Sequence, residues 1–244
     1  LQDGSLQVIT GSQDLGTGTR TVLAQVAAEE FGTDLDRVTV ILGDTGTAPF
    51  APASWGSMTV ASVAPAVRLA AADARNQIKD LVKQAFGEAA AKKPLNAERF
   101  RKLSETLGTF TVTGTGSRFP NPAGKRIVAY AVQSVQVVVD LVTGETRVER
   151  AVCVHDCGRV INPRLATSQV EGGFLQGMGM ALMEGRRIDP QTHRVLNPSL
   201  LGYKVPTVRD LPVIETIFLD DPDDKANNTG AIGIGEPPVI PAAA

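Results

Sequence analysis

The spacing of apolar positions predicts alternating strands and helices in the first part of the chain. Two short apolar runs, at 6–10 and 38–42, are typical of strands. Between them, apolar side chains recur every three or four positions, which predicts a helix that begins near Thr19 and ends at Gly32.

An Ala-rich segment then extends the helical pattern. After a turn-rich loop over 43–56, a long helix is predicted from Ser57 or Thr59 to near Phe86. Residues 87–107 form a polar connection with some helical character.

The second half of the chain opens with strands. Residues 128–140 are rich in Val, and a tight Thr-Gly turn joins them to a partner strand over 146–155. Asn162 followed by Pro163 is typical of a helix start, with Asn at the N-cap and Pro at the first helical position. We therefore predict a helix over 164–184.

The remaining pattern is less regular. Two short stretches are predicted at 200–205 and 213–219, followed by an acidic turn at 220–224 and a helix that begins after Pro241. The elements do not repeat as a regular strand–helix array, so we predict an α+β fold with mixed sheets and packed helices.

Composition narrows the class of protein and of partner. The chain has 244 residues, of which 43% are hydrophobic and 20% charged, as is ordinary for a globular protein. The net charge is −2 and the basic residues are scattered, so we expect neither nucleic acid nor a membrane as partner. We expect a cytoplasmic protein, with the periplasm as the alternative. The chain opens on Leu1 without an initiating Met, so we expect it to be a piece of a larger chain.

The two cysteines do not indicate a metal site or a disulfide. Cys153 and Cys157 lie in or beside a predicted strand, where a rise of about 3.3 Å per residue holds their Cα atoms too far apart for a disulfide. A metal site needs further convergent ligands, and the only histidines are His155 and His193. We predict two reduced cysteines, packed in or next to a strand, and no metal-ligating side chains.

Two loops before helices carry possible anion-binding groups. The Gly-rich loop from Gly11 to Thr21 would place free backbone N–H groups at the positive end of a helix dipole, which suits a phosphate. The segment Ser54–Thr59 offers small hydroxyl residues and a glycine at the next helix start. A structural turn for the first loop and plain helix capping for the second are the simpler alternatives.

The predicted helix in the second half contains four glycines between Gly172 and Gly179. Each costs roughly 1 kcal/mol relative to Ala in a helix interior, which indicates that something lies close to the backbone. Another helix and a ligand are both possible, and close helix packing is the favoured alternative. Gln176 is flanked by glycine and would present its amide to a planar ligand.

Near the C-terminus, Glu236 follows Gly235 and precedes two prolines. We interpret this run as a constrained turn that presents one carboxylate among apolar neighbours. Burial in an apolar pocket would raise the pKa of that carboxyl and make it a better proton acceptor near neutral pH. A solvated carboxylate on a tight turn is the alternative.

These motifs together resemble the large, molybdopterin-binding subunit of the xanthine dehydrogenase and aldehyde oxidase family. The resemblance rests on runs that occur in family order across nearly the whole chain: Asp14–Thr21, Gly43–Thr45, Ser54–Ser62, Asp156–Gly158, Asn162-Pro163, Val170–Gly177 and Gly235–Pro238. It covers only the C-terminal part of such a subunit. It implies a two-lobed cofactor-binding domain, with a first lobe over 1–125 that carries the two loops and a second over 126–244 that carries the Gly-rich helix and the glutamate.

The resemblance also implies roles for individual residues. Glu236 matches the family's general base, and Gln176 matches a glutamine that binds near the cofactor. The expected cofactor-binding positions are Gly16, Thr17, Gly18, Thr19, Gly56, Ser57, Thr59, Gln176 and Gly235. Many relatives carry Gln where this chain has Thr17, whose hydroxyl reaches less far.

The implied reaction is the oxidative hydroxylation of an aldehyde or N-heterocycle with water as the oxygen source. The implied cofactor is molybdopterin, with its cytosine dinucleotide as one form. An iron–sulfur cluster usually needs four cysteines, and the chain has two, so clusters and FAD are expected on other subunits.

Two other functions fit parts of the sequence. The chain could be a molybdopterin-binding module without catalysis, although retention of Glu236 argues against that. It could instead be a nucleotide-binding dehydrogenase that uses the Gly11–Gly18 loop, although the third glycine of that fingerprint is missing.

Overall fold

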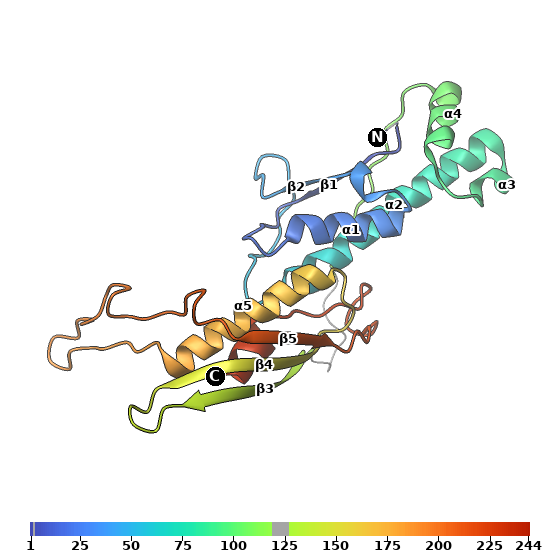
Figure 1. Cartoon of the computed structure of the whole chain (residues 1–244). Coiled ribbons are helices and arrows are strands. Elements are labelled where there is room, and N and C mark those ends of the chain that lie inside the picture. The colour runs from blue at the N-terminus through green and yellow to red at the C-terminus, as the bar shows by residue number, and fades with distance from the viewer. Residues whose placement is uncertain (2, 119–126) are drawn as a thin grey trace. The chain divides into compact units, whose positions relative to one another are not determined.

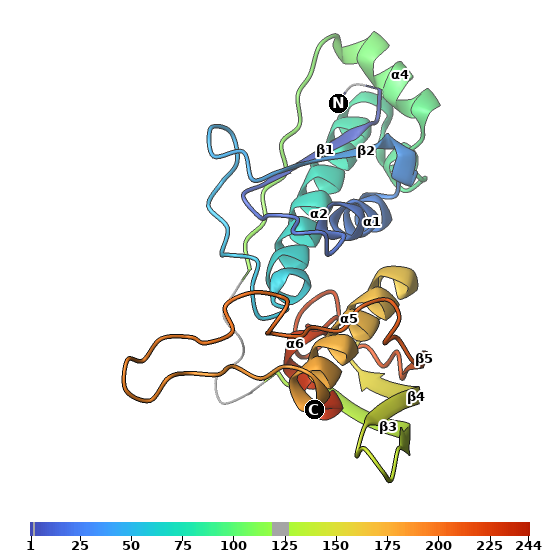
Figure 2. The ribbon, with the colours of Figure 1, turned by 60° about the vertical axis from the view of Figure 1, so that its left-hand side comes forward.

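The chain forms two compact units in a computed structural model that describes residues 1, 3–118 and 127–244 (Figures 1 and 2). Unit 1 comprises Leu1–Ile127 and Pro222–Ile232, and unit 2 comprises Val128–Asp221 and Gly233–Ala244. The predicted lobe boundary at 125/126 falls on residues outside those described. The return of Pro222–Ile232 to unit 1 departs from the simple division into two consecutive lobes.

Most predicted elements are present within one or two residues of their expected bounds. The order is β1 (Leu6–Thr10), α1 (Thr19–Phe31), a 3-10 turn η1 (Leu35–Arg37), β2 (Val38–Leu42), α2 (Thr59–Phe86), α3 (Glu88–Ala91), α4 (Ala97–Leu107), β3 (Tyr130–Val139), β4 (Thr146–Asp156), α5 (Pro163–Leu182), β5 (Val213–Phe218) and α6 (Glu236–Ala243). The expected α+β class is confirmed. Within the described part of the chain, no helix is long and apolar enough to cross a membrane.

Unit 1 is built on a β1–α1–β2 crossover whose strands pair in parallel, from Leu6 with Val38 to Thr10 with Leu42. Helix α1 ends at Gly32, which takes a left-handed conformation and donates its N–H to the Ala28 carbonyl, as predicted for a glycine C-cap. Helices α1 and α2 pack against each other (Figure 1). Both helices carry small and branched side chains that are buried: Leu23, Val26, Ala27, Ala64, Val67 and Ala71.

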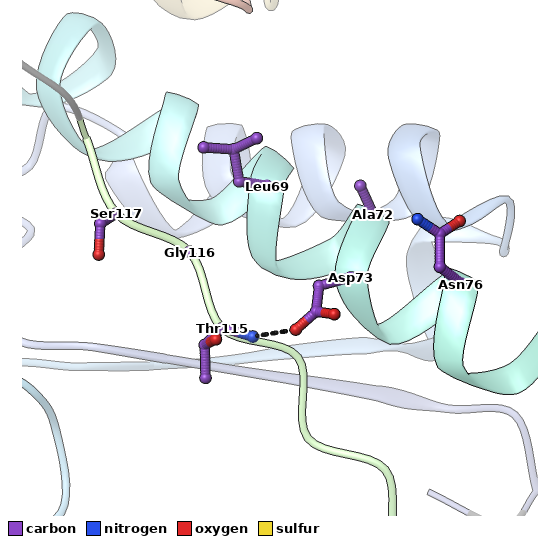
Figure 3. Close-up of a pocket in the computed structure, with 7 residues that line it drawn as sticks. All are labelled: Leu69, Ala72, Asp73, Asn76, Thr115, Gly116 and Ser117. Atoms are coloured by element: carbon purple, nitrogen blue, oxygen red, sulfur yellow. Dashed lines mark hydrogen bonds between the residues drawn. The ribbon is translucent and has the colours of Figure 1, made fainter.

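An extended segment, 113–117, lies along α2 in unit 1. A Cβ added at Gly114 would stand 2.1 Å from the Ala70 carbonyl oxygen, and one added at Gly116 would stand 2.1 Å from that of Ala66. Only glycine allows backbone to approach a helix this closely. The Thr115 N–H donates to the Asp73 carboxylate at 2.9 Å, beside an open pocket of about 460 Å³ (Figure 3).

Unit 2 is a three-stranded sheet, ordered β3-β4-β5, with α5 and α6 against one face (Figure 2). Strands β3 and β4 are antiparallel, and β4 and β5 are parallel. Helix α5 begins as predicted, because the Asn162 side chain accepts the Leu165 N–H at 3.0 Å and Pro163 takes the first helical position. The core joins sheet and helices through a buried set: Val148, Ala151, Cys153, Val170, Phe174, Met178 and Val239.

The glycines of α5 have different environments. A Cβ at Gly173 would lie 2.9 Å from the Val239 side chain, and one at Gly177 would lie 2.4 Å from the Ile240 carbonyl oxygen. Both therefore serve close packing of α5 on α6. Gly172 is exposed, and a Cβ added there would have no neighbouring atom within 4 Å. The sequence left open whether a helix or a ligand lies against these glycines. Helix α6 lies against Gly173 and Gly177, and the face of α5 at Gly172 is open.

Two sequence expectations were wrong. The C-terminal helix begins at Glu236, not after Pro241, so Glu236 stands at a helix start and not on a turn. The stretch 200–205 forms no helix or strand, and lies in a long excursion between α5 and β5 (Figure 1). That excursion is held by Asn197, whose side chain accepts the Arg187 N–H and donates to the Gly185 and Gly202 carbonyls.

We expect Gly177→Ala to destabilise the full-length protein by about 1–3 kcal/mol, because the new methyl group would force α5 and α6 apart. The matched control is Gly172→Ala on the same helix, which adds a methyl group into open space and should stabilise by up to about 1 kcal/mol through helix propensity. Denaturant unfolding measures both changes. Equal effects from the two substitutions would contradict this account of α5–α6 packing.

Candidate cofactor and catalytic site

The first loop of unit 1, between β1 and α1, is organised around Asp14. The Asp14 carboxylate accepts backbone N–H groups from Gly16 at 3.0 Å, Gly18 at 3.2 Å and Arg20 at 3.1 Å. Gly16 and Gly18 both take positive φ, at 93° and 82°, which folds the loop back over this carboxylate. The backbone N–H groups of this turn therefore already bind an anion, the Asp14 carboxylate.

This arrangement corrects the expectation of free N–H groups in the loop. Partial burial opposes ionisation of Asp14, but the three backbone donors outweigh it and hold the pKa of the carboxyl below its ordinary value. The hydroxyls of Thr17 and Thr19 lie 3.1 Å apart, with Thr17 exposed and Thr19 buried. Of these two threonines, Thr17 is therefore the one that solvent can reach. The same geometry disfavours a dinucleotide pyrophosphate on these N–H groups.

The second loop of unit 1 is fastened to the first by Gln13. The Gln13 side-chain oxygen accepts the Ser54 N–H at 3.0 Å, and the Ser54 hydroxyl donates to the Gln13 carbonyl at 3.0 Å. At Gly11, a Cβ would meet the Pro49 carbonyl oxygen at 2.4 Å, so the two backbones are in contact there as well. The structure therefore brings together the two loops that the sequence singled out separately.

Gln13 is the residue that the sequence analysis missed. It lies inside the Gly-rich loop but outside the motif that begins at Asp14. Its partner, Ser54, is far away in the sequence, and a single sequence holds no signal for that pairing.

The corner of the second loop exposes polar groups to solvent. Gly56 and Ser57 have consecutive positive φ values of 55° and 56°, and α2 begins at Thr59 two residues later. A positive φ is uncommon for serine, and such backbone strain clusters at functional sites. Gly56 is exposed, and Ser57 and Thr59 are half-buried. Hydroxyls beside open glycine backbone fit a ligand rich in acceptors, such as a pterin or a phosphate.

Large apolar side chains are exposed on the same stretches of unit 1. Leu15 in the first loop is 70% exposed, Trp55 in the second is 70% exposed, and Phe50 is 97% exposed. Single exposed apolar side chains are common on protein surfaces, so these three do not by themselves mark a binding surface.

In unit 2, Gln176 and Glu236 belong to the packed pair α5 and α6. Gln176 is exposed on α5, four residues after the open Gly172, so both lie on the uncovered side of the helix. Gly235 packs against α5, because its carbonyl oxygen would stand 3.3 Å from a Cβ at Gly173. Gln176 is three residues, or about 4.5 Å along the axis, beyond that contact.

Glu236 does not lie in the enclosed apolar pocket that the sequence predicts. Gly235 has a φ of 106° and is the N-cap of α6, and Glu236 is the first helical residue. Its neighbour Val239 is fully buried in the core and Ile234 packs against that core, but Glu236 itself is exposed. Within unit 2 the apolar neighbours anchor the backbone and do not enclose the carboxylate.

The cysteines agree with the prediction. Cys153 and Cys157 are free and buried, one in β4 and the other just after it. Burial raises the pKa of each thiol to about 11, so neither is a thiolate near neutral pH. Among the described residues, no group of three or more His, Cys, Asp and Glu side chains is arranged to hold a metal ion.

A family model of the molybdopterin cofactor-binding domain matches residues 1–212. This chain belongs to that family. The aldehyde oxidoreductase molybdenum-binding subunit PaoC of Escherichia coli K12 is 35% identical over 96% of the chain, and the putative xanthine dehydrogenase molybdenum-binding subunit XdhA of the same organism is 32% identical over all of it. The resemblance to these subunits is thereby confirmed.

Solved structures show the same fold. Quinoline 2-oxidoreductase from Pseudomonas putida 86 matches the whole chain with a TM-score of 0.86 at 24% identity, and a Cu,Mo-CO dehydrogenase matches it with a TM-score of 0.85 at 22% identity. The match covers 34% and 32% of those chains. The chain likewise spans about a third of the length of the curated relatives, which is 32% of PaoC and 34% of XdhA.

We expect Asp14→Asn to destabilise unit 1 at pH 7 by no more than about 1 kcal/mol, because most of the residue is exposed and solvent screens its interactions. The folded-state pKa is lowered, so the stabilisation is present above the ordinary value of 3.8 and is lost as the pH falls through the folded-state pKa. The difference in unfolding free energy between wild type and variant should therefore shrink when the pH is lowered below 3.8. A difference that stays the same below that pH would contradict this account of the loop.

Proposed function

We propose that this chain forms part of a molybdenum hydroxylase that oxidises an aldehyde or an N-heterocycle, with water as the oxygen source and Glu236 as the general base. The match of residues 1–212 to the molybdopterin cofactor-binding domain is the observation that carries this proposal. The relatives' names support an oxidoreductase and leave the choice between aldehyde and heterocycle to experiment.

The residues present fit a pterin cofactor by the chemistry of their donors. In unit 1, the hydroxyls of Thr17, Ser57 and Thr59 would donate to its acceptor atoms, and the backbone at Gly16 and Gly56 is open to close approach. In unit 2, the Gln176 amide can donate and accept at once, as a heterocycle edge requires. The cofactor, when bound, would supply the acceptor for the two electrons of the oxidation.

Glu236 would hold the proton that leaves water as the new carbon–oxygen bond forms. An ionised carboxylate accepts hydrogen bonds and protons, and the rigid entry through Gly235 fixes where it stands relative to α5. The exposure of Glu236 on unit 2 leaves it accessible to water and substrate.

Other components complete the proposed enzyme. The chain's two cysteines are buried and protonated, so we propose that iron–sulfur clusters and FAD lie on other subunits. We propose a cytosine dinucleotide as one form of the cofactor and the cytoplasm as the compartment.

We expect Glu236→Gln in the intact enzyme to lower turnover by at least 10²–10⁴-fold while the molybdenum content stays normal, because the amide keeps the shape but cannot accept the proton. Steady-state rates measure the turnover, and metal analysis of the same preparation measures the molybdenum content. Activity of the variant within about threefold of wild type would show that Glu236 is not the general base.

We expect Gln176→Ala to lower cofactor occupancy or turnover, whereas Gln169→Ala on the same helix should change neither. The two residues share one face of the helix, two turns apart, and only Gln176 is followed directly by a glycine, Gly177, and matches the family's glutamine that binds near the cofactor. Molybdenum content and steady-state rate distinguish them. Equal effects of the two substitutions would show that the helix contributes packing alone.

A further inference from the structure

The segment that leads to Glu236 is anchored in unit 1, although Glu236 itself belongs to unit 2. Residues Pro222–Ile232 belong to unit 1, and only Gly233, Ile234 and Gly235 separate that segment from Glu236. The contacts that hold Pro222–Ile232 therefore bear on the position of the Glu236 carboxylate.

The segment is a closed loop with a buried polar centre. The Asn227 side-chain oxygen accepts the N–H of Thr229 at 2.9 Å and its hydroxyl at 2.5 Å, and the Asn227 amide donates to the Ala231 carbonyl at 2.8 Å. Asn227 is 7% exposed and Thr229 2%. Gly230 takes a φ of 69°, and a Cβ there would stand 2.9 Å from Pro222. Each of these contacts fixes the loop internally.

A proline in helix α2 provides the place where the loop attaches. Pro65 has no N–H, so the Ala61 carbonyl one turn earlier loses its helical donor. The Arg118 Nε donates to that carbonyl at 3.1 Å. The Asn228 side chain in turn donates to the Pro65 carbonyl at 3.2 Å, which ties the loop to the irregular turn of α2.

Arg68, one turn along α2 from Pro65, completes the attachment. Its Nη1 donates to the Asn228 carbonyl, while its Nε pairs with the Glu30 carboxylate at 2.7 Å. Glu30 is largely buried, with 13% of its side chain exposed, and it also pairs with Arg75 at 2.7 Å. Arg75 thus shares the ion-pair cluster, but it binds the carboxylate and the backbone carbonyl of Glu30 instead of the loop.

We propose that Arg68 and Asn228 are positioning residues for Glu236. They fix the backbone of the loop that leads to Gly235 and the start of α6, so they act on the reaction through the placement of the carboxylate. This inference rests on the proposed role of Glu236 as general base. A shift of about 1 Å in a reacting group can cost about 10²-fold in rate, even when the substitution is far from the chemistry.

The test uses the intact holoenzyme and the matched pair Arg68→Ala and Arg75→Ala. Both remove an ion pair with Glu30, but only the first releases Asn228. We expect Arg68→Ala to lower kcat about 10- to 100-fold, with molybdenum content unchanged and KM within about twofold. Arg75→Ala should keep kcat within about threefold. Asn228→Ala, which removes only the donor to Pro65, should lower kcat in the same direction and serves if Arg68→Ala does not fold.

A double-mutant cycle separates positioning of Glu236 from general damage. Single-turnover reduction of the enzyme by substrate resolves rates too slow for steady state. If Arg68 acts through Glu236, adding Arg68→Ala to Glu236→Gln should leave the residual rate within about twofold of Glu236→Gln alone. A further loss as large as in the wild-type background, or equal effects of Arg68→Ala and Arg75→Ala, would overturn the inference and leave the role of Glu236 intact. Near-normal activity of Glu236→Gln would instead overturn the proposed function and, with it, the inference.

Discussion

Close approach of backbone at glycine positions is the constraint on which both units depend. In unit 2, the missing side chains of Gly173 and Gly177 let α6 lie directly on α5, and this contact fixes Gly235 and the start of α6. In unit 1, Gly11 lets the loop around Pro49 rest on the end of β1, and Gly114 and Gly116 let an extended segment lie along α2. A single methyl group at any of these positions would meet backbone or a tightly packed side chain. The residues proposed for function stand on elements that are placed in this way.

The local parts of this fold could be predicted from the sequence because their causes are local. Gly32 ends α1 and Asn162 caps α5 through groups a few residues away, and hydrophobic spacing located the strands. Glu236 was misplaced because Pro237 and Pro238 were interpreted as a turn signal. Proline is equally suited to the first turn of a helix, where the N–H groups have no helical partner, so the same residues start α6.

The organisation of the candidate site was predictable only in part. The motifs identified the two loops, the Gly-rich helix and the glutamate, but they did not show that Asp14 occupies the N–H groups of its own loop. They also could not show that Gln13 joins the loops or that Pro222–Ile232 returns to unit 1, because those contacts link residues far apart in the sequence. Close approach was correctly inferred for three of the four glycines of α5, because Gly173 and Gly177 meet α6 and Gly179 meets Glu184 and Pro206. Only the structure separates these three from Gly172, which faces open space.

The central claim is that this chain supplies part of the molybdopterin site of a molybdenum hydroxylase. The most direct measurement is the molybdenum and pterin content of the full-length protein, purified from a host that makes the cofactor. The account predicts about one molybdenum and one pterin per chain, together with oxidation of an aldehyde or an N-heterocycle. A folded, full-length protein that contains neither would contradict it.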